Sequence, residues 1–388
     1  MALPLKYNLR NVIVRWRSTL ATVIGMALVV AVYVLVQSLA VGIEKSSGNT
    51  GDPRNLLITR KGALAETTSL ITREQFRILQ YLPGIARDAQ DRPLVSADAL
   101  ILINLPRPAN AGSANVMLRG LGPAGPALRP QVRLVEGRWF VPGRREAVVS
   151  QRLAARFANM EIGQKFRAVG QQEITIVGHF DGSRSAFDSE VWLDGDEARG
   201  LFDRADYSSV LLRPESESAA AAIRQTLEND KRLKVKAVRE VDHYKEQTRT
   251  AGPIRLLGNF LATAMSIGAI FAAMNTLSAS VGARTREIGT LRVLGFKRRA
   301  ILLGFLIEGA LISAAGGVLG VLLSLCWNGY STGTLSWESF SEIVFDFRVT
   351  PVLALQGVLF SVVVGVIGSL FPAWRAARLP VIASLKSV

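Results

Sequence analysis

The sequence predicts a membrane protein with four α-helical transmembrane spans and an α+β extracytoplasmic domain inserted between the first and second spans. Three observations lead to this fold class. Four stretches are apolar enough and long enough to cross a bilayer core, which takes about 20 residues. A long segment of mixed composition, residues 44–255, separates the first stretch from the other three. Basic residues predominate in the short segments on one side of these stretches.

The four apolar stretches are residues 18–43, 256–283, 300–330 and 349–374. Three of them contain no charged residue, and the third contains a single one, Glu308. Buried helices of soluble proteins are shorter and keep a polar stripe, so transmembrane helices explain these stretches better.

A cleaved signal peptide is an alternative for the first stretch. It follows a basic start, and Ser38-Leu39-Ala40 resembles a small-x-small cleavage site. Its apolar run is nevertheless longer than the 7–15 residues typical of signal peptides. We therefore favour an uncleaved membrane anchor.

The distribution of charge predicts the orientation. The leader (1–17), the connector between the second and third spans (284–299) and the tail (375–388) are rich in Lys and Arg, whereas the loop 331–348 is mostly acidic. Positive loops stay in the cytoplasm. We expect a multi-pass protein of the cell inner membrane with both termini cytoplasmic. The net charge of +15 is then partly a topology signal and requires no nucleic-acid partner.

The inserted domain, residues 44–255, combines strand and helix patterns separated by Gly and Pro. Expected strands are 55–59, 99–105, 115–121, 132–140, 146–150, 174–180, 190–193 and 208–212. Expected helices are 72–82, 151–158 and 217–230, and Thr72 with Gln75 forms a capping box. The charged segment 239–255 is expected to be a stalk helix that is interrupted or kinked near Gly252-Pro253.

No catalytic, cofactor-binding or metal site is predicted. Residues 329–333 match a G-x-S-x-G nucleophile pattern, but no His follows them, and a flexible loop is expected there. The dipeptide Gly-Lys of a phosphate-binding loop does not occur. Cys326, the single cysteine, is expected to be an inert buried thiol. The acids Asp181, Asp188, Asp194 and Asp196 fit no calcium loop and are expected in solvated turns.

Two features of the spans suggest specific roles. Glu308 either packs or pairs with an arginine of the connector, or it takes part directly in transport. Small residues recur at every fourth position of the third and fourth spans, which lets helices approach closely within one subunit or between subunits. These packing residues are Gly309, Ser313, Gly317, Gly357, Ser361 and Gly365.

The connector has the composition of a short amphipathic helix. Ile288, Leu291 and Gly295 share one helical face, and Gly295 suits a helix C-cap. Such a surface either docks on a cytoplasmic protein or lies on anionic lipid.

The connector also resembles the signature of the FtsX-like permease family of ABC transporters, within it the macrolide-exporter and lipoprotein-release types. The similar residues are Arg284-Thr-Arg-Glu-Ile-Gly289, Leu291-Arg292, Gly295 and Phe305-Leu-Ile-Glu308. The closing segment 371–385 and the ectodomain segments 136–140 and 146–154 are similar as well.

This resemblance implies a dimeric permease, a homodimer or a heterodimer with a second permease, whose connector is a coupling helix on an ABC ATPase dimer. The coupling residues would be Arg284, Arg286, Glu287, Ile288, Leu291, Arg292 and Gly295. The chain itself would be no enzyme and would bind no cofactor; ATP and Mg would act through a separate ATPase subunit, since only a short leader precedes the first span. A periplasmic adaptor (membrane fusion protein) is a further expected partner. The family's ectodomain has a porter-like part and a distal insertion, which we place at about 125–185.

The expected function is therefore mechanotransmission, in which ATP hydrolysis moves the extracytoplasmic domain to export or extract a substrate. The alternative is a transmembrane regulator that activates a periplasmic cell-wall hydrolase without transport. The size of the inserted domain favours the exporter-like branch.

Overall fold

The computed structural model describes residues 16–63, 65–247, 251–335 and 341–380, so nearly all of the predicted leader and the end of the tail lie outside the described residues. The chain divides into two compact units. The helical unit comprises Met1–Val41, Gly252–Tyr330 and Asp346–Val388, and the inserted domain comprises Gly42–Ala251 together with Ser331–Phe345.

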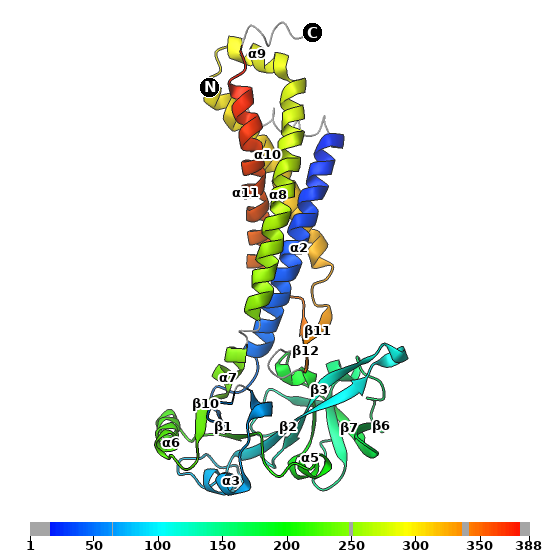
Figure 1. Cartoon of the computed structure of the whole chain (residues 1–388), viewed down its shortest axis with the longest axis vertical. Helices are drawn as coiled ribbons and strands as arrows, with labels where there is room; N and C mark the ends of the chain where they lie inside the picture. The colour runs from blue at the N-terminus through cyan, green and yellow to red at the C-terminus, as the bar shows by residue number, and fades with distance from the viewer. Residues whose placement is uncertain (1–15, 64, 248–250, 336–340, 381–388) are drawn as a thin grey trace. The chain divides into compact units, whose positions relative to one another are not determined.

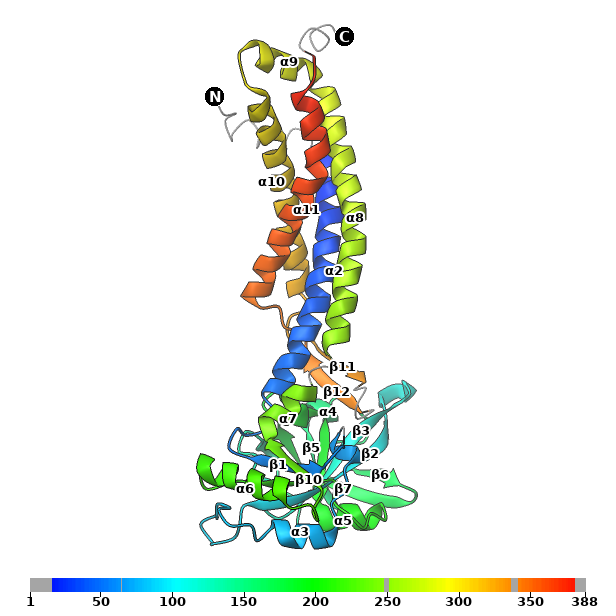
Figure 2. The same ribbon diagram turned by 60° about the vertical axis from the view of Figure 1, so that its left-hand side comes forward.

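Four helices of the helical unit are long and apolar enough to cross a membrane, which confirms the four predicted spans. They lie alongside one another, and the short helix α9 (Thr285–Val293) lies at one end of the bundle (Figures 1 and 2). The long helices are α2 (Trp16–Gly48), α8 (Ala251–Ala283), α10 (Arg298–Leu325) and α11 (Pro351–Ala377).

The ends of these helices differ from the predicted spans. α2 and α8 start earlier than predicted, α2 and α11 end later, and α10 stops at Leu325 instead of residue 330. Cys326 is the C-cap of α10 and is exposed, so its prediction as a buried thiol was wrong.

The inserted domain is built on one ten-stranded mixed sheet with the order β10-β1-β9-β2-β3-β8-β5-β7-β4, and β6 pairs with β7. β3 with β8 and β5 with β7 are parallel; the other pairs are antiparallel. The strands are β1 (Leu56–Arg60), β2 (Val95–Pro106), β3 (Ser113–Leu121), β4 (Arg133–Gly137), β5 (Glu146–Ser150), β6 (Lys165–Val169), β7 (Gln172–Asp181), β8 (Glu190–Asp194), β9 (Ser209–Leu212) and β10 (Val235–Arg239).

The long strand β2 divides this sheet into two halves. Its residues 95–98 pair with β9, and its residues 99–106 pair with β3. One apolar core, which includes Ile58 and Leu212, lies on the β1–β9–β10 half, and another, which includes Val149 and Ile176, lies on the β3–β8–β5–β7 half. The strands β4 to β7 fall within the range 125–185 that was predicted as a distal insertion, and they extend the same sheet beyond β8.

Short helices cover the sheet. These are α3 (Arg73–Leu79), α4 (Gln151–Ala154), α5 (Gly195–Leu201), α6 (Glu217–Asn229) and α7 (Glu240–Gln247). The capping box at the start of α3 is confirmed, because Gln75 N donates to Thr72 Oγ1 and Thr72 N donates to Gln75 Oε1.

The stalk segment 239–255 contains α7 and the start of α8, which agrees with the predicted interruption. Pro253 itself lies in the first turn of α8, where its missing N–H removes no helical bond. Two other local predictions were wrong. Asp188 and Asp194 are buried instead of solvated: Asp188 accepts a hydrogen bond from Gly182 N, and Asp194 caps α5.

The second concerns the loop after α10. Residues 331–348 contain a hairpin of two strands, β11 (Ser331–Leu335) and β12 (Glu342–Asp346), where a flexible loop was expected. The apolar side chains Val344 and Phe345 of this hairpin are buried, which gives the segment a fixed place within the inserted domain.

Candidate functional site

The connector forms helix α9, whose end is fixed by backbone hydrogen bonds. Gly295 N donates to Arg292 O at 3.2 Å, and Phe296 N donates to Leu291 O at 3.1 Å, which together make a Schellman motif. Gly295 has a φ of +91°, a backbone conformation that a residue with a Cβ rarely adopts. The prediction that Gly295 ends the connector helix is confirmed.

The start of α9 is anchored to the third span. Arg284 Nη1 donates to Glu308 Oε2 at 2.9 Å, and both side chains are buried. Ser280 Oγ donates to the other Glu308 oxygen at 3.4 Å, and the Arg284 guanidinium lies 5.2 Å from the centre of the Phe305 ring. Of the two hypotheses for Glu308, pairing with a connector arginine is confirmed, and this pair ties α9 to α10.

The exposed surface of α9 differs from the predicted one. Ile288 is only 2% exposed and packs against Leu277, Val281 and Ile301, so it is part of the helical unit's core and offers no docking surface. The exposed apolar residues are Val293 and Leu294, at 60% and 68%.

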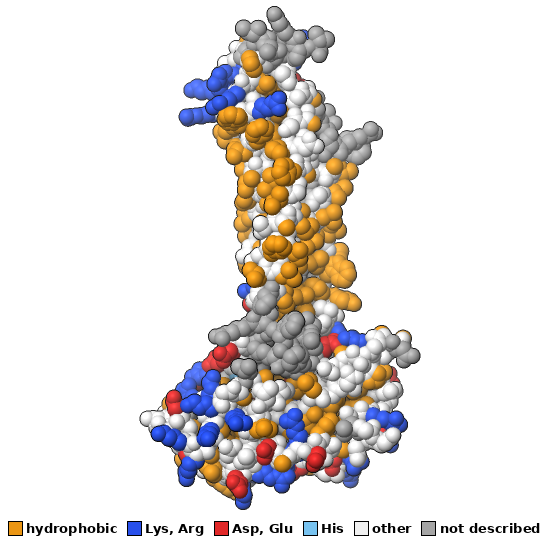
Figure 3. Space-filling view, in the orientation of Figure 1, with side chains coloured by type: hydrophobic (Ala, Val, Ile, Leu, Met, Phe, Trp, Pro, Cys, Tyr) orange, Lys and Arg blue, Asp and Glu red, His pale blue; other side chains and the backbone are white. Residues whose placement is uncertain are grey.

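The other predicted coupling residues also differ in exposure. Arg286 and Glu287 are exposed, Leu291 and Arg292 are half-buried, and Arg284 is buried against Glu308. Glu287 Oε2 accepts from Arg284 Nε at 3.3 Å. Lys and Arg side chains gather at the end of the helical unit that carries α9 (Figure 3). The candidate surface at this end of the helical unit is thus a basic rim around two exposed apolar side chains and one acid.

The six predicted packing residues lie at helix contacts inside the helical unit. A Cβ at Gly309 would lie 2.7 Å from Ser369 Cβ, one at Gly317 would lie 2.9 Å from Ser361 Cβ, and one at Gly357 would lie 2.8 Å from Val34 Cγ2. Gly365 lies against Ser313 in the same way. Of the two alternatives, packing within one subunit accounts for these residues.

A buried ionic network in the inserted domain was not predicted. Arg119 on β3 binds Glu190 with both ends of its guanidinium, at 2.8 and 2.7 Å, and its Nη1 lies 3.3 Å from Glu66 Oε2. Tyr244 of α7 donates to Glu66 Oε1 at 2.9 Å. The feature of the sequence that could have revealed this network is Arg119, an arginine within a strand whose neighbouring residues are buried. Its side chain is 1% exposed.

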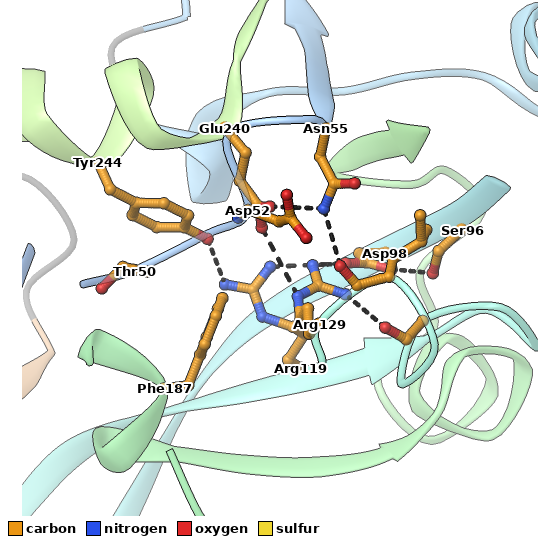
Figure 4. A network of polar contacts seen from close by, with 12 residues as sticks. Thr50, Asp52, Asn55, Ser96, Asp98, Arg119, Arg129, Phe187, Glu240 and Tyr244 are labelled. Atoms are coloured by element: carbon orange, nitrogen blue, oxygen red, sulfur yellow. Dashed lines mark hydrogen bonds and ion pairs between the residues drawn. The ribbon is translucent and has the colours of Figure 1, made fainter. Parts of the chain in front are cut away.

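A second part of this network joins the two ends of the inserted domain's chain (Figure 4). Glu240, the first residue of α7, accepts from Asp52 N and from Asn55 Nδ2, each at 2.8 Å. Arg129 Nη2 donates to Asp98, and its Nε lies 3.8 Å from Glu240 Oε1. The segment that follows α2 and the helix that precedes α8 are thereby held together.

The two buried glutamates differ in charge balance. Burial would raise the pKa of Glu66, but Arg119, His243 and the Ser209 hydroxyl outweigh it and lower the pKa to about 2. Burial raises the pKa of Glu240, and the attraction of Arg129 does not fully offset it. The cavity beside Glu66, Arg119 and Glu190 is about 50 Å³, room for about one or two waters. The network is therefore a structural joint.

Among the residues that the structure describes, no group of three His, Cys, Asp or Glu side chains is arranged to hold a metal ion. The described surface therefore offers two arrangements that bear on function. One is α9, a rigid helix anchored to a span, and the other is a sheet domain whose two chain ends are tied together.

Comparison with known proteins agrees with this architecture. Residues 259–381 match the family model of the FtsX-like permease C-terminal domain, and residues 18–230, more than half of the chain, match that of the MacB-like periplasmic core domain. The chain belongs to this family of ABC transporter permeases, and it is a multi-pass membrane protein with an α/β domain inserted after its first span.

Individual relatives are more distant. The ABC transporter permease YknZ of Bacillus subtilis is 27% identical over 264 residues, 64% of this chain and 63% of the relative. The macrolide export ATP-binding/permease protein MacB of Bdellovibrio bacteriovorus is 31% identical over 134 residues, 34% of this chain and 19% of the relative. The crystal structure of the YknZ extracellular domain matches with 17% identity and a TM-score of 0.37, over 47% of this chain and 99% of that one.

Proposed function

We propose that this chain is the membrane subunit of an ABC transporter of the mechanotransmission type. ATP hydrolysis by a cytoplasmic ATPase would move α9 and the helical unit, and this motion would drive the inserted domain to export or extract a substrate. Family membership supports the permease role. ATP and Mg would bind to the ATPase, a dimer, and two permease chains would assemble with it, together with a periplasmic adaptor where export requires one.

The observation that carries the proposal is the anchoring of α9. The Arg284–Glu308 pair holds its start, Ile288 fixes its middle in the core, and the Schellman motif ends it. A force applied to such a helix reaches α10 without being absorbed by a flexible loop. The exposed Val293 and Leu294 at its end are a suitable apolar contact for a protein partner.

The alternative to docking on a protein is that α9 is held on anionic lipid. The substitution Glu287→Lys distinguishes these two hypotheses. Each basic residue near an anionic membrane surface contributes roughly 1 kcal/mol, so a lipid-bound α9 would bind as well or better after this change. An α9 docked on a protein would lose the attraction between Glu287 and the partner's surface, and the new lysine would be repelled by that surface. We expect Glu287→Lys to leave membrane insertion intact and to weaken co-purification of the ATPase, or to uncouple its hydrolysis.

The matched control is Glu287→Gln, which removes the negative charge beside Arg284 without adding a positive charge. It should retain most of the ATPase association. If Glu287→Lys keeps wild-type association and wild-type ATPase activity in reconstituted vesicles, the docking role of this residue is wrong.

A further inference from the structure

The hairpin β11–β12 is packed into the inserted domain although it lies far from it in sequence. Val344 and Phe345 are 3% and 2% exposed, and Val344 N donates to Ser189 Oγ at 2.7 Å. Ser189 ends the short 3-10 helix that precedes β8. The hairpin therefore contacts the segment before β8 through its backbone, and two of its apolar side chains are buried.

One carboxylate fastens this hairpin. Glu342, the first residue of β12, is 7% exposed in its side chain and forms ion pairs with Arg107 and Arg156. Arg107 follows β2 and also lies 5.5 Å from the centre of the Phe157 ring, and Arg156 follows α4. Each Glu342 oxygen serves a different arginine, so a single side chain bridges two elements of the inserted domain.

The opposite strand leaves room for this arrangement. Gly333 of β11 lies against the ion pair: a Cβ there would collide with Glu342 Oε1 and would lie 2.7 Å from Arg156 Nη2. Gly333 is the second glycine of the G-x-S-x-G pattern. The lack of space for a side chain explains the glycine at this position, and no nucleophile is needed to explain it.

The hairpin's connections to the helical unit are short. Residues 326–330 join α10 to β11, and residues 347–350 join β12 to α11. An extended chain spans at most about 3.5 Å per residue, so linkers of this length reach at most about 18 Å and 14 Å. A movement of α10 or α11 away from the inserted domain that exceeds this reach would pull on the hairpin.

We propose that Glu342 is a positioning residue that makes this hairpin a strap between the α10–α11 pair and the inserted domain. The strap adds a third connection to those made by the chain segments after α2 and before α8. Its mechanical consequence rests on the proposed function, because it assumes that the helical unit moves during ATP hydrolysis. The docking of the hairpin by Glu342 does not depend on that assumption.

Hydrogen exchange of the intact, detergent-solubilised protein tests the docking. Glu342→Gln removes the charge but keeps the size of the side chain, so β12 amides, Val344 among them, should exchange at least about tenfold faster. The matched control is Glu173→Gln, which breaks an exposed ion pair with Lys165 in the same domain. Unchanged exchange of β12 in Glu342→Gln would overturn the proposal.

Reversal of the charges distinguishes a fastening role from a general packing role. Glu342→Arg alone should release the hairpin, and Glu342→Arg combined with Arg107→Glu and Arg156→Glu should restore slow exchange. If the triple variant stays as fast as Glu342→Arg, the ion pairs do not hold the hairpin and the proposal fails. Arg156→Gln provides a milder variant in case the reversed single variant is not produced in folded form.

The coupling part is read with the partner ATPase in vesicles. ATP-dependent changes in exchange of β5 and β7 should fall at least about threefold in Glu342→Gln and recover in the triple variant. If Glu342→Gln frees the hairpin yet leaves these changes at the wild-type level, the strap role is wrong. If the wild type itself shows no ATP-dependent change, the proposed function fails, and the docking result stands separately.

Discussion

Individual charged residues account for much of the organisation of both units. Arg284 and Glu308 come from a basic connector and an apolar span, and each would be costly to bury alone. The sequence places Glu308 shortly after the basic connector, which suggested pairing with a connector arginine as one of two hypotheses but did not single out Arg284. By contrast, the partners of Arg119 come from η1 (Glu66–Thr68) and from the start of β8, so only the folded sheet brings them together.

The opposite pKa shifts of Glu66 and Glu240 lead to a prediction about pH. The pKa of Glu66 is lowered to about 2 from a value of 4.5, so its charge stabilises the folded domain above about pH 4.5, and this contribution is lost as the pH falls towards 2. The contribution is of the order of 3 kcal/mol. We expect the unfolding temperature of the inserted domain to fall across this window. It can be followed by the fluorescence of Trp192 in a full-length variant whose other five tryptophans are replaced by phenylalanine.

Glu66→Gln should weaken this pH dependence and destabilise the domain at neutral pH. Glu240→Gln is the matched comparison, since burial raises the pKa of Glu240 and its charged form is disfavoured in the fold. Its loss should destabilise the domain less at neutral pH. Equal effects of the two substitutions would contradict the charge balance assigned to the network.

At the scale of elements, local signals predicted what depends on neighbouring residues. The capping box of α3, the glycine end of α9 and eight strands of the large sheet were found where expected. The strands β6 and β10 were missed because Lys and Arg alternate with apolar residues in both of them. Each of the two pairs with one other strand of the sheet. The hairpin β11–β12 was missed because contacts with Arg107, Arg156 and Ser189, distant in sequence, hold it in place.

The small-residue stripes predict a contrast between two glycines of the spans. In Gly365→Ala, the new methyl group would collide with Ser313 and lie 3.0 Å from Gly309 O, so α10 and α11 would have to separate. Overpacking of this kind costs about 1–3 kcal/mol. We expect a lower unfolding temperature in detergent for Gly365→Ala.

Gly268→Ala is the matched control, because Gly268 is an exposed residue within α8 and no atom lies within 4 Å of a Cβ placed there. It should leave the unfolding temperature unchanged or raise it slightly, since alanine favours a helix. A drop as large as that of Gly365→Ala would mean that the close contact of α10 and α11 is not the cause.

At the scale of the whole molecule, hydropathy predicted the number and order of spans because each one is long and nearly free of charge. The two-unit division also followed from composition, except that the hairpin 331–345 joins the inserted domain. Hydropathy cannot predict that this segment packs into the inserted domain, because a short polar loop has the same hydropathy whether it is packed against a domain or exposed to solvent.

The orientation of the chain in the membrane is the last prediction. Because Lys and Arg flank the spans at the leader, the connector and the tail, we expect these parts to be cytoplasmic and the inserted domain to lie outside. In a Cys326→Ser background, a cysteine at exposed Ser216 should react with a membrane-impermeant maleimide in intact cells. A cysteine at Ser387, in the tail, should react only after the cells are permeabilised, which also shows that this position is reactive. Cys326 must be replaced because it is itself exposed. Labelling of Ser387→Cys in intact cells, or protection of Ser216→Cys, would reverse the orientation and with it the assignment of α9 to the cytoplasm.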